Sequence, residues 1–351
     1  MIPPMPLKGY NWHETYDWNY DNVPEAQLTD EKVIPGKWDY CGLALNSPLG
    51  IAAGPLLNGK WILYYASLGF DVLTYKTVRS RERASYPLPN LQPVQSESLR
   101  QDGNTLVTTS AMHNGWAVSF GMPSRAPEIW RADIEQTRSR LPKNKILSVS
   151  VVATPQPEWM IDDLAADFAL CARWAVESGA DCVEANFSCP NVASADAQLF
   201  QQPETAAMVA AHLRESVGSK PLLIKIGHIT DESLAGSLAQ ALAPHVSALV
   251  MVNCIPAKMV DGGGRPLFDG QTRGIAGPAI YEASLAQVRL FNRVIRAQGL
   301  SLGLVGVGGI TSAAQVQAHL QAGSHAVQLA TAAMLNPSTA REIRGNLGSR
   351  T

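Results

Sequence analysis

Short apolar runs rich in β-branched residues alternate with longer amphipathic stretches from residue 46 to the end of this 351-residue chain. This alternation is typical of strands and helices that build a parallel sheet. Eight apolar runs occur, and eight strands close a (β/α)8 barrel. The runs are "GIAAG", "FDVLTYKTV", "KILSVSVV", "DCVEANFS", "PLLIKIG", "ALVMVN", "LGLVGVGGI" and "AVQLATAAM". The sequence therefore predicts an α/β protein with the TIM-barrel fold.

The regions outside this repeat suggest how the chain is organised. Residues 1–45 are rich in Trp, Tyr and Pro without a clear period, and we expect an N-terminal extension packed on a barrel of residues 46–351. Two segments, 79–127 and 254–277, interrupt the alternation. Connections of this length in a compact domain are usually lids or binding walls.

Composition excludes several classes of protein. Hydrophobic residues make up 46% of the chain and charged residues 17%, which indicates a globular core. A net charge of -2 argues against broad capture of nucleic acid. The start has no signal-peptide pattern and no apolar run is long enough for a membrane helix, so we expect a soluble, cytoplasmic protein. The five cysteines contain no C-x-x-C pair, which disfavours a disulfide framework or a metal cradle.

Polar residues gather where the predicted strands end. Lys76 and Thr77 end the second run, Asn186 the fourth, Lys225 the fifth and Asn253 the sixth. In a barrel these strand ends share one face, and that face carries the active site. This convergence is the main local argument for an enzyme.

The side chains at these strand ends suit an electron-rich ligand. A lysine in an apolar strand is costly to bury unless its charge is matched, and Lys76 and Lys225 together suit a cofactor that gathers negative charge, such as a reduced flavin. Asparagine amides suit a flat heterocycle with ring N–H and C=O groups. Each residue also has a simpler interpretation, because single lysines snorkel to solvent and single asparagines often cap turns.

Two successive segments near the end of the chain, "VGVGGI" and "VQLATAAM", predict a phosphate site. Gly308 and Gly309 lie near the end of the seventh run, and Ala330 and Thr331 follow "AVQL" in the eighth. Loops after strands seven and eight of such barrels commonly hold phosphate through backbone N–H groups. Alternatively, the glycine pair only permits a tight turn.

Several motifs together resemble the dihydroorotate dehydrogenase family, and also the flavin half of dihydropyrimidine dehydrogenases. The motifs "NSPLGIAAG", "LTYKTV", "NFSCPNV", "PLLIKIG", "VMVNCI", "RGIAGPAI", "VGVGGI" and "VQLATAAM" follow the family's order between residues 46 and about 336. "NFSCPNV" resembles the soluble, class 1 branch, which uses cysteine as base.

The resemblance implies FMN across the barrel mouth and a homodimer. The cofactor-binding residues it implies are Ala52, Ala53, Gly54, Lys76, Thr77, Asn186, Lys225, Val252, Gly277, Gly308, Gly309, Ala330 and Thr331. The implied substrate-binding residues are Ser119, Phe120, Gly121, Met122, Asn186, Asn191, Asn253 and Cys254. Cys189 and Lys76 would be catalytic: the Cys189 thiol would take a proton from the carbon next to a carbonyl while hydride leaves the neighbouring carbon for flavin N5.

This chain departs from the family pattern at the substrate. Class 1 enzymes have N-S-M-G-L-P-N where residues 118–124 read V-S-F-G-M-P-S, and Cys254 replaces the usual serine. Losing a polar partner at a ring-binding site changes discrimination strongly. A relative acting on another unsaturated ring or carboxylate, and a non-redox barrel that binds a phosphorylated ligand, therefore stay open. With no cluster-ligating cysteines, electrons would leave to a small acceptor or a separate protein. His113 in the first insertion is a further candidate for the site, but a lone loop histidine is more often simply exposed or packed, so both interpretations stay open.

Overall fold

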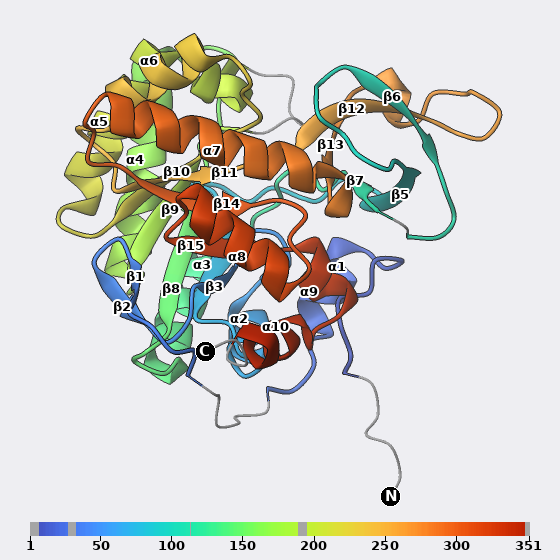
Figure 1. Cartoon of the computed structure of the whole chain (residues 1–351), viewed down its shortest axis with the longest axis horizontal. Helices are drawn as coiled ribbons and strands as arrows, with labels where there is room; N and C mark the ends of the chain where they lie inside the picture. Colours follow the sequence, from blue (N-terminus) through green and yellow to red (C-terminus); the bar gives the residue numbers. More distant parts are fainter. Residues whose placement is uncertain (1–6, 27–32, 113, 189–194, 348–351) are drawn as a thin grey trace, which may run out of the picture.

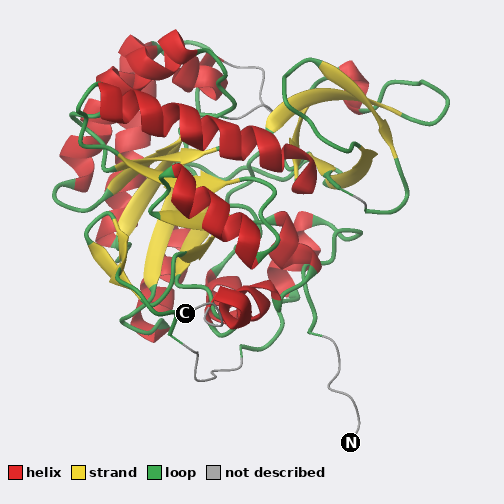
Figure 2. Cartoon of the chain, in the orientation of Figure 1, coloured by secondary structure: helices red, strands yellow, loops and turns green. Residues whose placement is uncertain are grey.

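Eight parallel strands close into a barrel, as the sequence predicts (Figures 1 and 2). The computed structural model describes residues 7–26, 33–112, 114–188 and 195–347. In chain order, the barrel strands are β3 (Leu49–Ile51), β4 (Val72–Val78), β8 (Ile146–Val151), β9 (Cys182–Asn186), β10 (Leu222–Lys225), β11 (Ala248–Met251), β14 (Gly303–Val307) and β15 (Ala326–Leu329). Each of the eight apolar runs supplies one strand.

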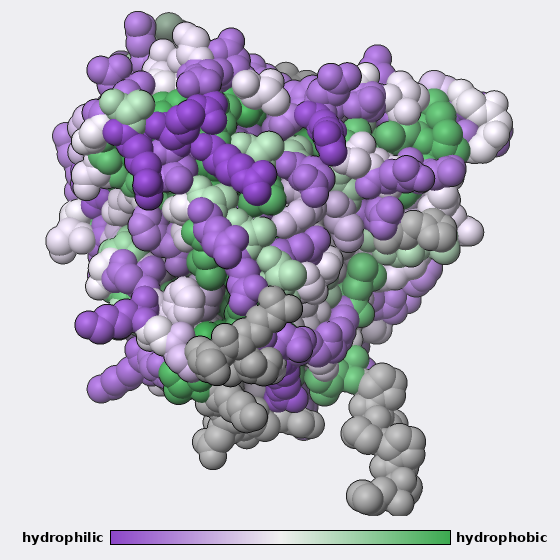
Figure 3. All heavy atoms as spheres, in the orientation of Figure 1, coloured by the Kyte–Doolittle hydropathy of each residue, from purple (hydrophilic) through white to green (hydrophobic). Residues whose placement is uncertain are grey.

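Helices surround the barrel and return the chain between strands (Figure 2). They are α2 (Gly59–Ala66), α3 (Pro127–Arg140), α4 (Ile161–Glu177), α5 (Pro203–Val217), α6 (Glu232–Leu242), α7 (Tyr281–Ala297), α8 (Ala313–Ala322), α9 (Thr331–Leu335) and α10 (Thr339–Leu347). The short 3-10 turns are η1 (Ala195–Gln201), η2 (Phe268–Gly270) and η3 (Pro278–Ile280). Hydrophilic side chains cover the outer face of α7, where Arg289, Arg293 and Arg296 are exposed (Figure 3).

Alternate residues of each strand fill the barrel interior. Val72, Ile146, Cys182 and Leu223 belong to one buried cluster, to which Val250, Val305 and Ala326 also contribute. Continuing in steps of two along β4, β9 and β10 reaches Lys76, Asn186 and Lys225 at the carboxyl ends. Side chains of a strand alternate between two faces, so this period aims the polar strand ends into the barrel mouth.

The N-terminal residues pack on the barrel and its helices. A hairpin of β1 (Trp38–Tyr40) and β2 (Leu43–Leu45) places Tyr40 in the interior cluster. Helix α1 (Tyr16–Asp21) lies against α2, because the Trp61 indole Nε1 donates to the Asn19 carbonyl at 2.9 Å. The Tyr64 hydroxyl donates to the Lys8 carbonyl at 2.6 Å.

The two insertions fold together into a second, five-stranded closed sheet beside the barrel (Figure 1). The first insertion supplies β5 (Leu91–Gln95), β6 (Asn104–Thr108) and β7 (Trp116–Val118), and the second supplies β12 (Ile255–Val260) and β13 (Arg273–Ala276). Strand β12 pairs in parallel with β6, and β13 pairs antiparallel with β7. The sequence predicted walls or lids for these segments, but not their pairing.

None of the described helices combines the length and the apolar character that a membrane crossing requires.

Candidate active site

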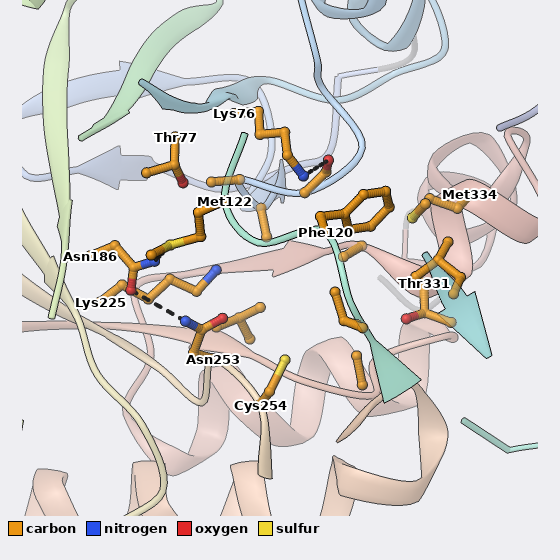
Figure 4. Close-up of a pocket in the computed structure, with 18 of the residues that line it drawn as sticks. Lys76, Thr77, Phe120, Met122, Asn186, Lys225, Asn253, Cys254, Thr331 and Met334 are labelled. Carbon is orange, nitrogen blue, oxygen red and sulfur yellow. Dashed lines mark hydrogen bonds between the residues drawn. The ribbon is translucent and has the colours of Figure 1, made fainter. Parts of the chain in front are cut away.

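A cavity of about 870 Å³, counting the space at its mouth, opens at the carboxyl ends of the barrel strands (Figure 4). Barrel residues and residues of the second sheet line it together. The lining residues are Ala52, Ala53, Gly54, Lys76, Thr77, Leu91, Trp116, Val118, Phe120, Met122, Asn186, Lys225, Asn253, Cys254, Ala276, Val307, Ala330, Thr331 and Met334. A mostly apolar cleft with a few convergent polar groups is the usual form of a small-molecule site.

Lys76 brings one cationic group to the cavity. Its Nζ donates to the Gly54 carbonyl at 3.3 Å and lies 4.3 Å from the centre of the Phe120 ring. An aromatic face attracts a nearby ammonium and also shields it from water. Lys76 is therefore held between the barrel and the first insertion.

Lys225 brings a second ammonium to the same cavity from β10. Its neighbour in the adjacent strand β9 is Asn186, paired in parallel register. The Lys225 Nζ lies 3.9 Å from Oε1 of Glu184, and the Glu184 side chain is completely buried. Burying this lysine is possible because a carboxylate lies beside it.

The two predicted amides of Asn186 and Asn253 meet in the cavity. Asn253 Nδ2 donates to Asn186 Oδ1 at 3.3 Å, drawn as a dashed line in Figure 4, and also donates to the Ser188 carbonyl. Asn186 Nδ2 contacts the Met122 sulfur at 3.4 Å. These contacts fix the two amides side by side, so that they present hydrogen-bonding groups to one ligand.

Two buried arginines anchor the loop of residues 119–124 over the cavity. Arg273 Nε donates to the Ser119 hydroxyl at 2.9 Å, and Arg79 Nε donates to the Met122 carbonyl at 2.9 Å. Gly121 has a φ of +74°, and a Cβ there would lie 2.6 Å from the Tyr86 ring. Phe120 and Met122 line the cavity, whereas Ser119 and Gly121 are outside its lining.

A smaller cavity of about 360 Å³ adjoins the first and holds the predicted phosphate residues. Gly277, Gly308, Gly309, Ala330 and Thr331 all line it, and it shares Asn253, Ala276, Val307, Ala330 and Thr331 with the first cavity. Gly308 and Gly309 have φ values of +126° and +71°. A Cβ on Gly309 would lie 2.7 Å from Tyr281, so only glycine fits there.

Backbone donors also remain available in this smaller cavity. Within the described chain, no hydrogen bond has the amide of Gly308, Gly309 or Thr331 as donor. Unused N–H groups at a strand end are suitable for an anion. The two cavities together form an elongated site with lysines and amides in one part and glycine amides in the other.

Some residues named from the sequence lie elsewhere. Val252 is fully buried and does not line either cavity. Cys189, Asn191 and His113 lie outside the described residues. In the described chain, no group of three or more His, Cys, Asp or Glu side chains is placed to hold a metal.

Sequence reasoning missed other residues of the site. Leu91, Trp116, Ala276, Val307 and Met334 line the first cavity. Nothing in a single sequence marks these apolar residues as site residues, since several reach the cavity only through the fold of the insertions. Glu184 was also missed, although an acidic residue in the middle of the strand "CVEAN" is as unusual as Lys225 in "PLLIKIG".

The fold is a (β/α)8 barrel, and its candidate active site lies at the carboxyl face, where barrels of this class carry their active sites. A sequence model of the family described as dihydroorotate dehydrogenase matches residues 37–350. The chain belongs to the dihydroorotate dehydrogenase family, oxidoreductases that act on a CH–CH group.

Individual relatives agree with this assignment. A dihydroorotate dehydrogenase from Dictyostelium discoideum is 31% identical over 96% of each chain. The catalytic subunit of dihydroorotate dehydrogenase B (NAD(+)) from Maridesulfovibrio salexigens is 26% identical, over 88% of this chain and 91% of the relative. A crystal structure of the Eimeria tenella enzyme in complex with ferulenol superposes with a TM-score of 0.72 at 17% identity, covering 94% of this chain and 87% of that one, which shows a shared fold.

Proposed function

We propose that this protein oxidises dihydroorotate, or a closely related dihydropyrimidine, with FMN as its cofactor. The observation that carries the proposal is the continuity of the two cavities. Two lysines and two asparagine amides line the larger cavity, and the smaller one is lined by glycines with unused N–H groups. This arrangement suits a ligand with a flat polar ring at one end and a phosphate at the other.

The residues present fit FMN in shape and charge. A Cβ on Gly54 would meet only the Ala330 Cβ, at 4.0 Å, so the backbone leaves open space where a flat ring approaches. Lys76 and Lys225 would face the ring edge, and Gly277, Gly308, Gly309 and Thr331 would hold the phosphate. When bound, FMN supplies a hydride acceptor at N5.

The chain's own residues would orient the substrate and move its proton. Asn186, Asn191 and Asn253 would hold the ring, with Cys254 beside them. Phe120 and Met122 would cover it and exclude water, because the loop that carries them is anchored by Arg79 and Arg273. The Cys189 thiol would remove the proton from the carbon next to the carbonyl, and would return it in the reducing direction.

An anaerobic titration tests this function. Purified protein is expected to be yellow, and stoichiometric dihydroorotate should bleach the flavin absorbance without added acceptor. A colourless protein that takes up no added FMN would instead support a non-redox barrel that binds a phosphorylated ligand. A yellow protein whose flavin dihydroorotate does not bleach would contradict the proposed substrate but would still support FMN as the cofactor.

A second candidate within the family is a related dehydrogenase or reductase for another unsaturated ring or carboxylate. Val118 favours it, because this apolar side chain lines the cavity where the family pattern has asparagine. The same titration, run with a panel of dihydropyrimidines, separates the two candidates by which compound bleaches the flavin fastest.

The remaining expectations concern assembly and location. We propose a homodimer that works in the cytoplasm and passes electrons to a small acceptor or a separate acceptor protein. Size-exclusion chromatography with light scattering tests the dimer. Steady-state assays with fumarate, NAD⁺ and a soluble quinone test the acceptor.

A further inference from the structure

A buried carboxylate, Glu184, lies beside Lys225, which lines the proposed flavin site, and none of the proposed steps uses it. It is two residues before Asn186 on β9, so both side chains point into the barrel. Its side chain is completely buried, and Oε1 lies 3.9 Å from the Lys225 Nζ. A charge at this depth is costly, so its presence calls for an explanation.

The hydrogen bonds of Glu184 satisfy only one of its two oxygens. Oε2 accepts from Gln328 Nε2 at 3.0 Å, whereas Oε1 has no hydrogen-bond partner within the described chain. The same Gln328 Nε2 also lies 3.2 Å from the Tyr40 hydroxyl oxygen and 3.3 Å from the Thr74 hydroxyl oxygen, either of which can accept its second hydrogen. Gln328 therefore fixes one carboxylate oxygen of Glu184. The other oxygen, which accepts no hydrogen bond in the described chain, is the one near the Lys225 ammonium.

Asp71, another completely buried carboxylate, shows what an ion pair built for stability looks like in this protein. It accepts from Lys145 Nζ at 3.1 Å, from Arg344 at 2.7 Å and from the Ser47 hydroxyl at 2.6 Å. Both of its oxygens are hydrogen-bonded. Among the described residues, Glu184 is paired with one cation, the Lys225 ammonium, at the longer distance of 3.9 Å, which is a poor arrangement for stability alone.

We propose that Glu184 acts through Lys225: its carboxylate is the buried counter-charge of the Lys225 ammonium at the flavin, and it holds the flavin's midpoint potential down. The inference rests on the proposed FMN function. Lys76 and Lys225 together place two positive charges at the cavity, and Glu184 reduces their sum to one. A negative charge near the ring disfavours the extra electron density of the reduced state, so Glu184 holds the potential down.

The isosteric variant Glu184→Gln tests the charge, and Glu184→Asp tests its placement. In the holoenzyme, Glu184→Gln should shift the ratio of reduced to oxidised flavin by tenfold or more toward the reduced form. This corresponds to a rise of about 30 mV for a two-electron couple, measured by equilibrium with reference dyes. Glu184→Asp keeps the charge and should stay closer to the wild-type potential.

Tyr40→Phe is the matched control, because it removes one hydroxyl contact of Gln328 and leaves every charge in place. It should leave the potential unchanged. In the FMN-free protein, Glu184→Gln should lower the melting temperature more than Tyr40→Phe does, since it leaves a buried ammonium without its carboxylate. A potential for Glu184→Gln that equals the wild type, falls below it, or is matched by Tyr40→Phe would overturn the proposal.

The outcome also separates this inference from the proposed function. If the wild-type protein binds no FMN, the proposed function fails and the FMN-free melting comparison still reports on the Glu184–Lys225 pair. If the wild type binds FMN and Glu184→Gln leaves its potential unmoved, only the inference about Glu184 fails.

Discussion

The ammonium of Lys76 lies 4.3 Å from the centre of the Phe120 ring. Lys76 belongs to barrel strand β4 and Phe120 to the loop after β7 in the first insertion. The contact therefore couples a barrel residue to the segment that covers the cavity. It also orients a charge that, in the proposed function, faces both flavin and substrate.

Phe120→Leu should lower the catalytic efficiency without preventing FMN from binding. A desolvated cation–π contact contributes about 1 to 2 kcal/mol. If this energy is lost from the transition state, kcat/KM for dihydroorotate should fall by roughly 5- to 30-fold while FMN stays bound. Tyr10→Phe is the control, since it keeps the ring that packs on Phe120 and removes a buried hydroxyl with no hydrogen-bond partner in the described chain. Equal kinetics for Phe120→Leu and wild type would argue against a role for this contact.

Gly54→Val should weaken FMN binding while the barrel still folds. The added side chain would enter open cavity, because the nearest heavy atom to a Cβ there is 4.0 Å away. Steric conflict of roughly 3 kcal/mol predicts about 100-fold weaker FMN binding, measured by fluorescence titration of the FMN-free protein. Gly345→Val, at an open position on α10, should bind FMN normally. Normal FMN binding by Gly54→Val would place the ring elsewhere.

Val118→Asn should improve the use of dihydroorotate if that is the substrate. Val118 lines the cavity at the position where the family pattern has asparagine, and one added hydrogen bond is worth about 1 kcal/mol. We expect KM to fall by about fivefold. Val107→Asn, on the partly exposed strand β6, should change nothing. A higher KM for Val118→Asn would favour a substrate with an apolar group at this position.

Cys189→Ser should keep FMN bound and slow flavin reduction. Removing a general base typically lowers the rate of the chemical step by about 10²- to 10⁴-fold. The single-turnover rate of flavin reduction by dihydroorotate should therefore fall by at least about 100-fold. Stopped-flow absorbance measures it. Cys41→Ser, at a half-buried cysteine of the N-terminal hairpin, should reduce at the wild-type rate. Reduction of Cys189→Ser at an unchanged rate would remove this residue from the mechanism.

His319 should make the fold sensitive to acid. Burial, with a smaller contribution from the charge of Arg289, lowers the pKa of His319 to about 4. The unfolded chain then binds more protons than the folded one between about pH 4 and pH 6.5, so stability is complete above this window and falls as pH falls through it. The shift corresponds to about 3 kcal/mol.

Urea unfolding at pH 4.5 and pH 7 measures this effect. His319→Leu should lose less stability between the two pH values than the wild type does. The control is His245→Leu, which removes a half-buried histidine from the loop after α6 and should retain the wild-type dependence on pH. Identical pH dependence in His319→Leu and wild type would show that another group titrates.

Local sequence patterns were sufficient to predict the barrel. Each of the eight apolar runs became a strand of the barrel, and Gly69, Gly179 and Gly323, which follow helical runs in the sequence, adopt positive φ between helix and strand. The polar residues at the strand ends converge because parallel strands in a barrel share one carboxyl face. Lys76, Asn186, Lys225 and Asn253 could therefore be brought together from the sequence.

Contacts between distant segments were decided only by the tertiary structure. Strand β6 pairs with β12, although about 150 residues separate them, and no local period marks either segment as a partner of the other. The pairing of β7 with β13 sets Trp116 opposite Ala276, and both residues line the cavity, while Arg79 and Arg273 fix the covering loop. The 3.9 Å approach of Glu184 to Lys225 likewise depends on the register of β9 and β10. Periodicity reports which face a residue occupies, whereas the partner it meets is set by the closure of the barrel and the packing of the insertions on it.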